Sequence, residues 1–122
     1  AIEVPLVQNR QGHYLVGGKI NSEKVTFLLD TGATDVVVPE STARDLGLGF
    51  GRKGVAITAN GRVVIHETRI DRLEIGEITL VDVKASINPG MPRGAILLGM
   101  SALSKIEFTQ TGKTLTLRQR YL

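Results

Sequence analysis

Turn-forming residues divide this sequence into short stretches, and this feature most limits what the chain can fold into. Glycine supplies 14 of the 122 residues, and the stretches between turns are short apolar runs or alternate apolar with polar residues. Alternation with a period of two is typical of strands that bury one face. The sequence therefore predicts a mainly β fold, and its length fits one domain, residues 1–122.

The first part of the chain predicts four strands and one helix. The strands are expected at residues 3–7, 12–20, 25–30 and 35–39. Gly17-Gly18 predicts a bend or bulge, and Asn21-Ser22 predicts a turn. Residues 40–47 predict a short helix that ends at Gly47, a residue suited to the left-handed cap position.

The second part predicts three hairpins, one more strand and one more helix. Asn60-Gly61 separates two alternating runs over residues 54–70, which is the strongest short hairpin signal. Further hairpins are expected around Gly76 and around Thr111-Gly112. Between these two lie a Pro- and Gly-rich loop, a buried strand and a helix of about two turns, expected at residues 88–94, 95–99 and 100–106.

Composition excludes several classes of site. The chain has no cysteine, so it has no disulfide, zinc-thiolate site or thiol nucleophile. His13 and His66 do not share a metal-ligand spacing, and we predict no metal. The net charge of +3 is spread along the chain with few aromatic residues, which argues against nucleic-acid binding. No stretch approaches a membrane span of roughly 20 apolar residues.

Asp30 is the residue with the clearest chemical interest. It ends an apolar run, Phe27-Leu28-Leu29, and precedes Thr31-Gly32. A carboxylate displayed at the end of a buried strand is well placed for acid-base chemistry. An ordinary turn aspartate gives the same short string, so Asp-Thr-Gly alone decides little.

Two other chemistries use similar strings. Phosphate-binding loops of the actin and sugar-kinase type, and phosphoaspartate enzymes, also place an Asp near a Gly after an apolar run. Both need a larger α/β frame than this sequence offers. The sequence also lacks a Gly-Lys-Ser/Thr motif.

A longer pattern resembles the retropepsin-like aspartic proteases, especially their single-domain bacterial members. Residues 27–39 read FLLDTGATDVVVP, residues 95–103 read AILLGMSAL, and a hairpin lies between them. The family has Asp-Thr-Gly-Ala, a flap hairpin and an apolar-apolar-Gly-helix segment in this order. The resemblance implies a closed β-barrel with a flap hairpin, one or two short helices and no cofactor.

The resemblance also implies a mechanism for Asp30. In this family two such carboxylates share one proton and activate a water that attacks a peptide bond. Thr31 and Gly32 would support the pair through hydroxyl and backbone hydrogen bonds. No other Asp in this sequence has the motif. The second carboxylate would therefore come from a second copy of the chain in a homodimer.

Further site residues follow from the resemblance alone. The implied substrate-binding residues are Ala33, Thr34, Asp35 and, in the flap, Thr58, Ala59, Asn60 and Gly61. The implied structural residues of the loop before the second helix are Leu97, Leu98 and Gly99. Viral members often have Asp and Arg where this chain has Thr34 and Met100, so the viral style of interface is not carried over.

The implied substrate is an extended peptide or protein. The alternative function is a non-catalytic module of the same fold that binds peptides or dimerises. Bacterial members suggest a periplasmic or membrane-anchored domain. Since the sequence begins with Ala, we expect any membrane anchor to lie outside this chain.

Overall fold

The computed structural model describes residues 1–59 and 61–120, and this part of the chain is mainly β. Only two short helices occur in it, as predicted. In chain order the elements are β1 (Ile2–Val7), β2 (Leu15–Ile20), β3 (Glu23–Leu29), β4 (Val36–Pro39), α1 (Glu40–Asp45), β5 (Lys53–Thr58), β6 (Gly61–Ile75), β7 (Ile78–Asn88), β8 (Ile96–Leu98), α2 (Met100–Leu103), β9 (Glu107–Thr111) and β10 (Thr114–Gln119).

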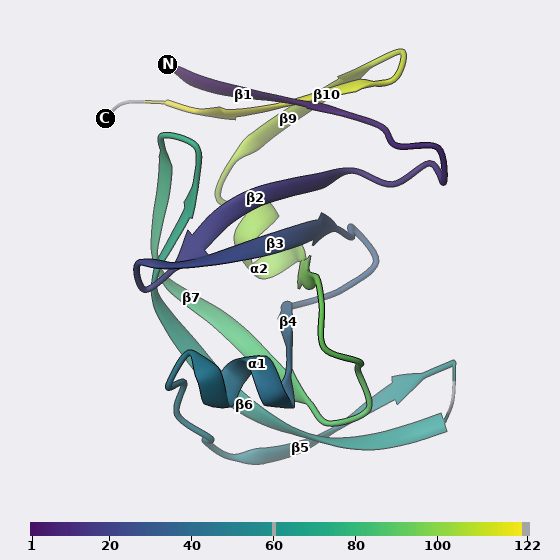
Figure 1. Cartoon of the computed structure of the whole chain (residues 1–122), viewed down its shortest axis with the longest axis vertical. Helices are drawn as coiled ribbons and strands as arrows, with labels where there is room; N and C mark the ends of the chain where they lie inside the picture. Colours follow the sequence, from purple (N-terminus) through teal and green to yellow (C-terminus); the bar gives the residue numbers. More distant parts are fainter. Residues whose placement is uncertain (60, 121–122) are drawn as a thin grey trace.

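Six strands close into a barrel, which confirms the predicted fold class. Their order is β2-β3-β8-β4-β7-β6, and β6 pairs back onto β2 (Figure 1). The sheet is mixed, because β3 runs parallel to β8 and β4 runs parallel to β7. β5 adds to β6 outside this ring. The hairpin β5/β6 therefore extends from the barrel.

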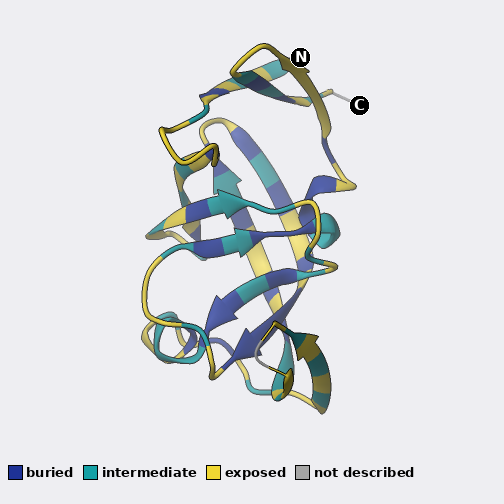
Figure 2. Ribbon diagram, turned by 90° about the vertical axis from the view of Figure 1, so that its right-hand side faces the viewer, coloured by how far each residue is buried: buried dark blue, intermediate teal, exposed yellow. Residues whose placement is uncertain are grey.

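The core lies inside this barrel. Buried and exposed positions alternate along several strands, as the two-residue period predicts (Figure 2). Among the side chains with no exposed surface are Phe27, Ile70, Leu73, Ile87 and Leu98. Burying one such side chain contributes about 1.5–3 kcal/mol, so the barrel interior is the main source of stability.

The predictions at Asn21-Ser22 and at Gly47 are confirmed. Asn21 and Ser22 have φ angles of 49° and 73°, as a two-residue hairpin turn of type I′ requires. Gly47 has a φ of 68° just after α1, and its amide donates to the carbonyl of Arg44 at 3.1 Å. The left-handed cap thus ends α1 where the sequence placed it.

Two local predictions are wrong. β2 pairs with β3 without interruption at Gly17 and Gly18, so no bulge occurs there. Gly18 instead allows a close approach, because a Cβ atom at this position would lie 2.2 Å from the carbonyl oxygen of Glu74. The second helix has only four residues, Met100–Leu103, rather than two turns, because the chain turns toward β9 after Ser104.

A separate sheet of three strands covers one end of the molecule. β10 lies between β1 and β9, and both pairings are antiparallel within one chain (Figure 1). Leu6, Leu115 and Leu117 are buried and connect this sheet to the core. Neither helix of the described chain has the length and hydrophobicity of a membrane span.

The close approach at Gly18 makes a first testable prediction. Gly18→Ala should lower the free energy of unfolding by at least about 2 kcal/mol, because the new methyl group collides with backbone where β6 closes the barrel. Gly17→Ala is the matched control, since nothing lies within 4 Å of its Cβ position. Urea unfolding followed by circular dichroism measures both. Equal stability of the two variants would contradict this account of barrel closure.

Candidate active site

Asp30 sits at the end of β3, in a turn built by backbone hydrogen bonds. Its amide donates to the carbonyl of Leu98 at 3.1 Å, and its own carbonyl accepts from the amide of Ala33 at 3.2 Å. The Asp30 side chain is half-buried, and its Oδ1 accepts from the amide of Gly32 at 2.9 Å. The carboxylate is therefore held in one orientation by the turn that displays it.

The turn from β8 into α2, residues 98–101, is called the α2 corner here. It holds the loop that follows Asp30. The amide of Met100 donates to the carbonyl of Ala33 at 2.8 Å, and the amide of Ser101 donates to the carbonyl of Thr34 at 2.9 Å. Thr34 itself is exposed, and Met100 packs against the core. Backbone bonds thus connect the loop and the helix at Thr34 and Met100.

Ser101 adds a side-chain link that the sequence did not reveal. Its hydroxyl accepts from the amide of Val36 at 2.9 Å and donates to the carbonyl of Lys84 at 2.7 Å. The hydroxyl therefore joins α2 to both β4 and β7. A serine in a short helix gives no sequence signal for this role, because both partners are distant backbone groups.

A cleft of about 760 Å³ opens beside Asp30. One wall is the loop after β3, which contributes Gly32, Ala33, Thr34 and Asp35. The opposite wall is the hairpin β5/β6, and the floor comes from β4, β7 and β8 with the loop after β7. These other lining residues are Val37, Val55, Ala56, Ile57, Thr58, Val63, Ile65, Ser86, Asn88, Gly90, Met91, Pro92 and Leu97.

The structure brings most of the predicted site residues to this cleft. Thr58 lies on its hairpin wall, and its hydroxyl donates to the carbonyl of Gly61 at 3.0 Å. Thr31 is exposed and does not line the cleft, and neither do Ala59 and Gly61 near the hairpin turn. Asn60 lies outside the described residues. The roles assigned to these residues stay predictions.

The three structural residues predicted near the second helix have different surroundings. Leu97 lines the cleft, whereas Leu98 is fully buried. Gly99 is buried where the chain leaves β8 for α2. A Cβ atom at Gly99 would lie 2.0 Å from the carbonyl oxygen of Asp35 and 2.8 Å from that of Ala33. Glycine is therefore required for the loop after Asp30 to pack on the α2 corner.

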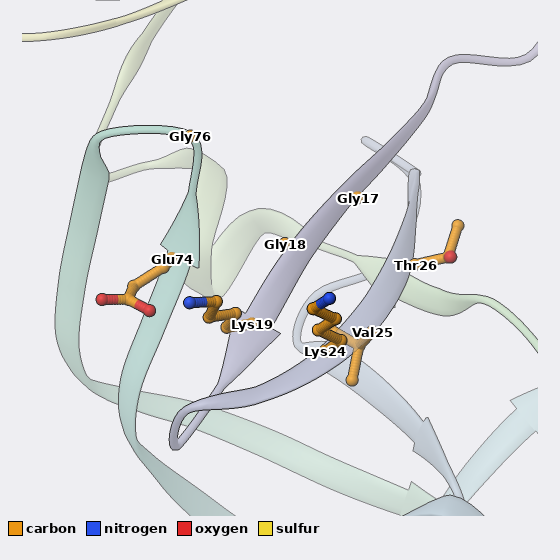
Figure 3. A pocket seen from close by; sticks show the side chains of 8 residues that line it. All are labelled: Gly17, Gly18, Lys19, Lys24, Val25, Thr26, Glu74 and Gly76. Carbon is orange, nitrogen blue, oxygen red and sulfur yellow. The ribbon is translucent and has the colours of Figure 1, made fainter.

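A second hollow, of about 650 Å³, lies between β2, β3 and the end of β6. Figure 3 shows Lys19, Lys24 and Glu74 around it. Its only acidic side chain among the described residues, Glu74, is paired with Arg72 at 2.8 Å. That ion pair engages the Glu74 carboxylate, whereas the described residues give Asp30 no ion pair, so the cleft at Asp30 is the better candidate for chemistry.

The two histidines lie apart from the cleft lining. His66 packs edge-on against Phe50, with ring centres 5.3 Å apart, and His13 is exposed. Nowhere in residues 1–59 and 61–120 do three or more metal-binding side chains come together.

Comparisons with known proteins agree with this arrangement. Residues 16–105 match the family model described as "gag-polyprotein putative aspartyl protease". A crystal structure of a retropepsin-like aspartic protease from Rickettsia conorii superimposes with a TM-score of 0.80 at 28% identity, covering 96% of this chain and 99% of that one. An EIAV protease in complex with an inhibitor has a TM-score of 0.63 at 21% identity, covering 79% of this chain and 89% of that one, which shows a shared fold.

Two uncharacterized proteins are also similar in sequence. One, from the cobV 5′ region of a Sinorhizobium species, is 30% identical over 88% of this chain and 48% of its own length. The other, from Rickettsia prowazekii strain Madrid E, is 26% identical over 93% of this chain and 49% of its own length. The chain thus spans about half the length of both relatives.

The contact at Gly99 makes a second testable prediction. Gly99→Ala should cost about 3 kcal/mol of unfolding free energy or more, because its methyl group meets backbone oxygens that α2 holds in place. Gly49→Ala is the control, since Gly49 is exposed with open space at its Cβ position, and we expect a change within about 0.5 kcal/mol. Denaturant unfolding measures both. If Gly99→Ala were as stable as Gly49→Ala, the backbone around residue 99 could shift to accept a methyl group, and the prediction would be contradicted.

Proposed function

The chain belongs to the family of retropepsin-like aspartic proteases, and from this membership we propose that it is an aspartic endopeptidase that works as a homodimer. The observation that carries the proposal is the position of Asp30. Its carboxylate is fixed by the amide of Gly32 at one wall of a cleft whose opposite wall is a hairpin. Such a cleft fits an extended peptide, which can pair with strand edges along its length.

The need for a dimer follows from the number of suitable carboxylates. Asp35 also lines the cleft, but Val36 and Val37 follow it, so it lacks the Thr-Gly turn that orients Asp30. A second chain related by a two-fold axis would bring another Asp30 to face the first. The exposed hydroxyl of Thr31 and the exposed backbone of Gly32 are available to pack against that second loop.

The proposed reaction uses the two carboxylates in different protonation states. Two carboxylates about 3 Å apart cannot both ionise, so the pair holds one proton. The ionised carboxylate accepts a proton from a water between them as that water attacks the carbonyl carbon of the peptide bond. The protonated carboxyl donates its proton to the carbonyl oxygen, which gives a tetrahedral diol. Protonation of the nitrogen and cleavage of the C–N bond then release the two products.

The hairpin β5/β6 would act as the flap over the bound peptide. Ala56, Val63 and Ile65 are half-buried and line the cleft. β6 pairs with β7 from His66 onward and with β2 at Leu73 and Glu74, whereas its earlier part pairs only with β5 among the described residues. A hairpin attached at one end can open to admit a peptide and close over it.

Replacement of the proposed catalytic carboxylate tests the mechanism. Asp30→Asn should lower peptide hydrolysis by at least about a thousand-fold, because the amide cannot exchange the proton that the pair shares. Its oxygen can still accept from Gly32, so the thermal unfolding midpoint should change little. Asp71→Asn, exposed on β6 outside the cleft lining, is the control. Equal hydrolysis by Asp30→Asn and wild type would refute this role of Asp30, and a wild type that cleaves no peptide would leave a non-catalytic peptide-binding module as the better function.

Activity should also depend on protein concentration. One chain has one Asp30, so dilution below the dissociation constant of the dimer should reduce the activity per chain. Sedimentation velocity and peptide cleavage, measured across one dilution series, test this relation. Excess Asp30→Asn protein should also inhibit wild type by forming mixed dimers. Full activity per chain in a sample that sediments as a monomer would contradict the shared site.

A further inference from the structure

Two polar side chains on β7 lie at the floor of the cleft, and their free ends have no hydrogen-bond partner among the described residues. Ser86 and Asn88 are only 5% and 8% exposed, and both line the cleft. They are two positions apart on a strand, so they point to the same face of the sheet. Buried polar groups normally have partners within the protein, so a pair that faces a binding cleft calls for an explanation.

The orientation of the Asn88 amide is fixed by its own loop. The backbone amide of Gly90 donates to Oδ1 of Asn88 at 2.8 Å. A backbone N–H can only donate, so this bond identifies the oxygen of the side-chain amide. The Nδ2 group is therefore the free end, with two hydrogens to donate.

The free ends keep contact with open space. Within the described residues, no side-chain nitrogen or oxygen is both fully buried and without a partner. Nδ2 of Asn88 and the hydroxyl of Ser86 make no hydrogen bond there, so each keeps some exposed surface. Since both residues line the cleft, a bound ligand can reach both groups.

The strand register connects these groups to Asp30. Leu97 of β8 pairs with Leu28 of β3 and with Val37 of β4, and Val37 pairs with Ser86 of β7. Leu97, Val37 and Ser86 therefore form one row across the cleft floor. Neighbouring strands are about 4.8 Å apart, so Ser86 lies roughly 10 Å from Leu97. A peptide that extends along the cleft from Asp30 advances about 3.3 Å per residue, so a residue a few positions from the one at Asp30 can place its side chain over Ser86.

The charges of the cleft limit which side chain can bind there. Its ionisable lining residues are Asp30 and Asp35, and no Lys, Arg or His lines it among the described residues. A substrate carboxylate would meet like charges, and a cation would meet the N–H groups of Asn88. A neutral amide fits both groups, because its oxygen can accept from Nδ2 while its nitrogen donates to the Ser86 hydroxyl.

We propose that Ser86 and Asn88 form a polar subsite that selects an asparagine or glutamine side chain at one position of the peptide. The proposal rests on the peptide-cleaving function above and adds a specificity to it. The apolar neighbours Val37 and Leu97 exclude water from the pair of hydrogen bonds. An isosteric leucine in the peptide would leave both buried groups unpaired, which is how a polar pocket discriminates strongly.

Asn88→Asp is the sharpest test, because it changes only the NH₂ group of the side chain. It keeps the oxygen that accepts from Gly90 and replaces the donating NH₂ with a second acceptor. Asn21→Asp is the matched control: Oδ1 of Asn21 likewise accepts a backbone amide, that of Arg72 at 3.0 Å, and Asn21 lies outside the cleft lining. Ser86→Ala removes the other partner.

The measurement compares kcat/KM for peptide pairs that differ by Asn against Leu, or Gln against Met, at each position around the cleaved bond. Wild type and Asn21→Asp should prefer the amide at one position by at least about tenfold, and Asn88→Asp should lose that preference there alone. Ser86→Ala should weaken it and serves as the readout if Asn88→Asp does not fold. A wild type without amide preference at any position, or an Asn88→Asp protein that keeps it, would overturn the subsite.

Binding separates this proposal from the proposed function. The same labelled peptides are titrated into wild type and into Asp30→Asn, with fluorescence anisotropy as the readout. Amide-selective binding without cleavage would support the subsite and refute the protease. Cleavage without amide selectivity would refute the subsite and leave the protease standing. Neither binding nor cleavage of any peptide would refute both.

Discussion

The parallel pairing of β3 with β8 is the interaction on which the rest of the site depends. It places Leu98 opposite Leu29, so that the carbonyl of Leu98 accepts the amide of Asp30 at 3.1 Å. The chain then leaves β8 through Gly99, whose missing side chain lets the loop after Asp30 rest on α2. The carboxylate is thus positioned by two segments far apart in sequence, and both are rigid because they belong to a closed barrel.

The cleft combines a firmly packed floor with a loosely attached wall. Its floor belongs to strands whose opposite faces form the core, including Val36, Val38 and Ile87 with no exposed surface. The hairpin β5/β6 instead carries Val55 and Ile57, which line the cleft and are 55% and 86% exposed. Elements with few buried contacts open at low cost in free energy. This contrast suits a site that must hold its reactive group still and yet admit a chain.

Local chemistry made much of the fold predictable, whereas contacts between distant backbone groups did not. The turn at Asn21-Ser22 and the cap at Gly47 depend on neighbouring residues alone, and the motif around Asp30 indicated the candidate site. The role of Gly18 depends on Glu74, a partner 56 positions away along the chain. Ser101 likewise bonds the backbone of Val36 and Lys84. A sequence pattern carries no sign of such partners, and the same holds for Ser86 and Asn88 on the cleft floor.

The terminal strands limit how two chains can assemble. β1 pairs along its whole length with β10 of the same chain, and ion pairs cross this sheet from Arg118 to Glu3 at 3.2 Å and from Arg120 to Glu107 at 3.0 Å. Exchange of β1 with a partner would first break these backbone bonds. A second subunit can instead add to a free edge, β1 or β9, and leave each three-stranded sheet intact. Since the loop after Asp30 is already held by α2 within one chain, the homodimer proposed above would need only to bring two such loops together. In the proposed homodimer, contacts at such an edge could then vary in strength without disturbing the geometry at Asp30.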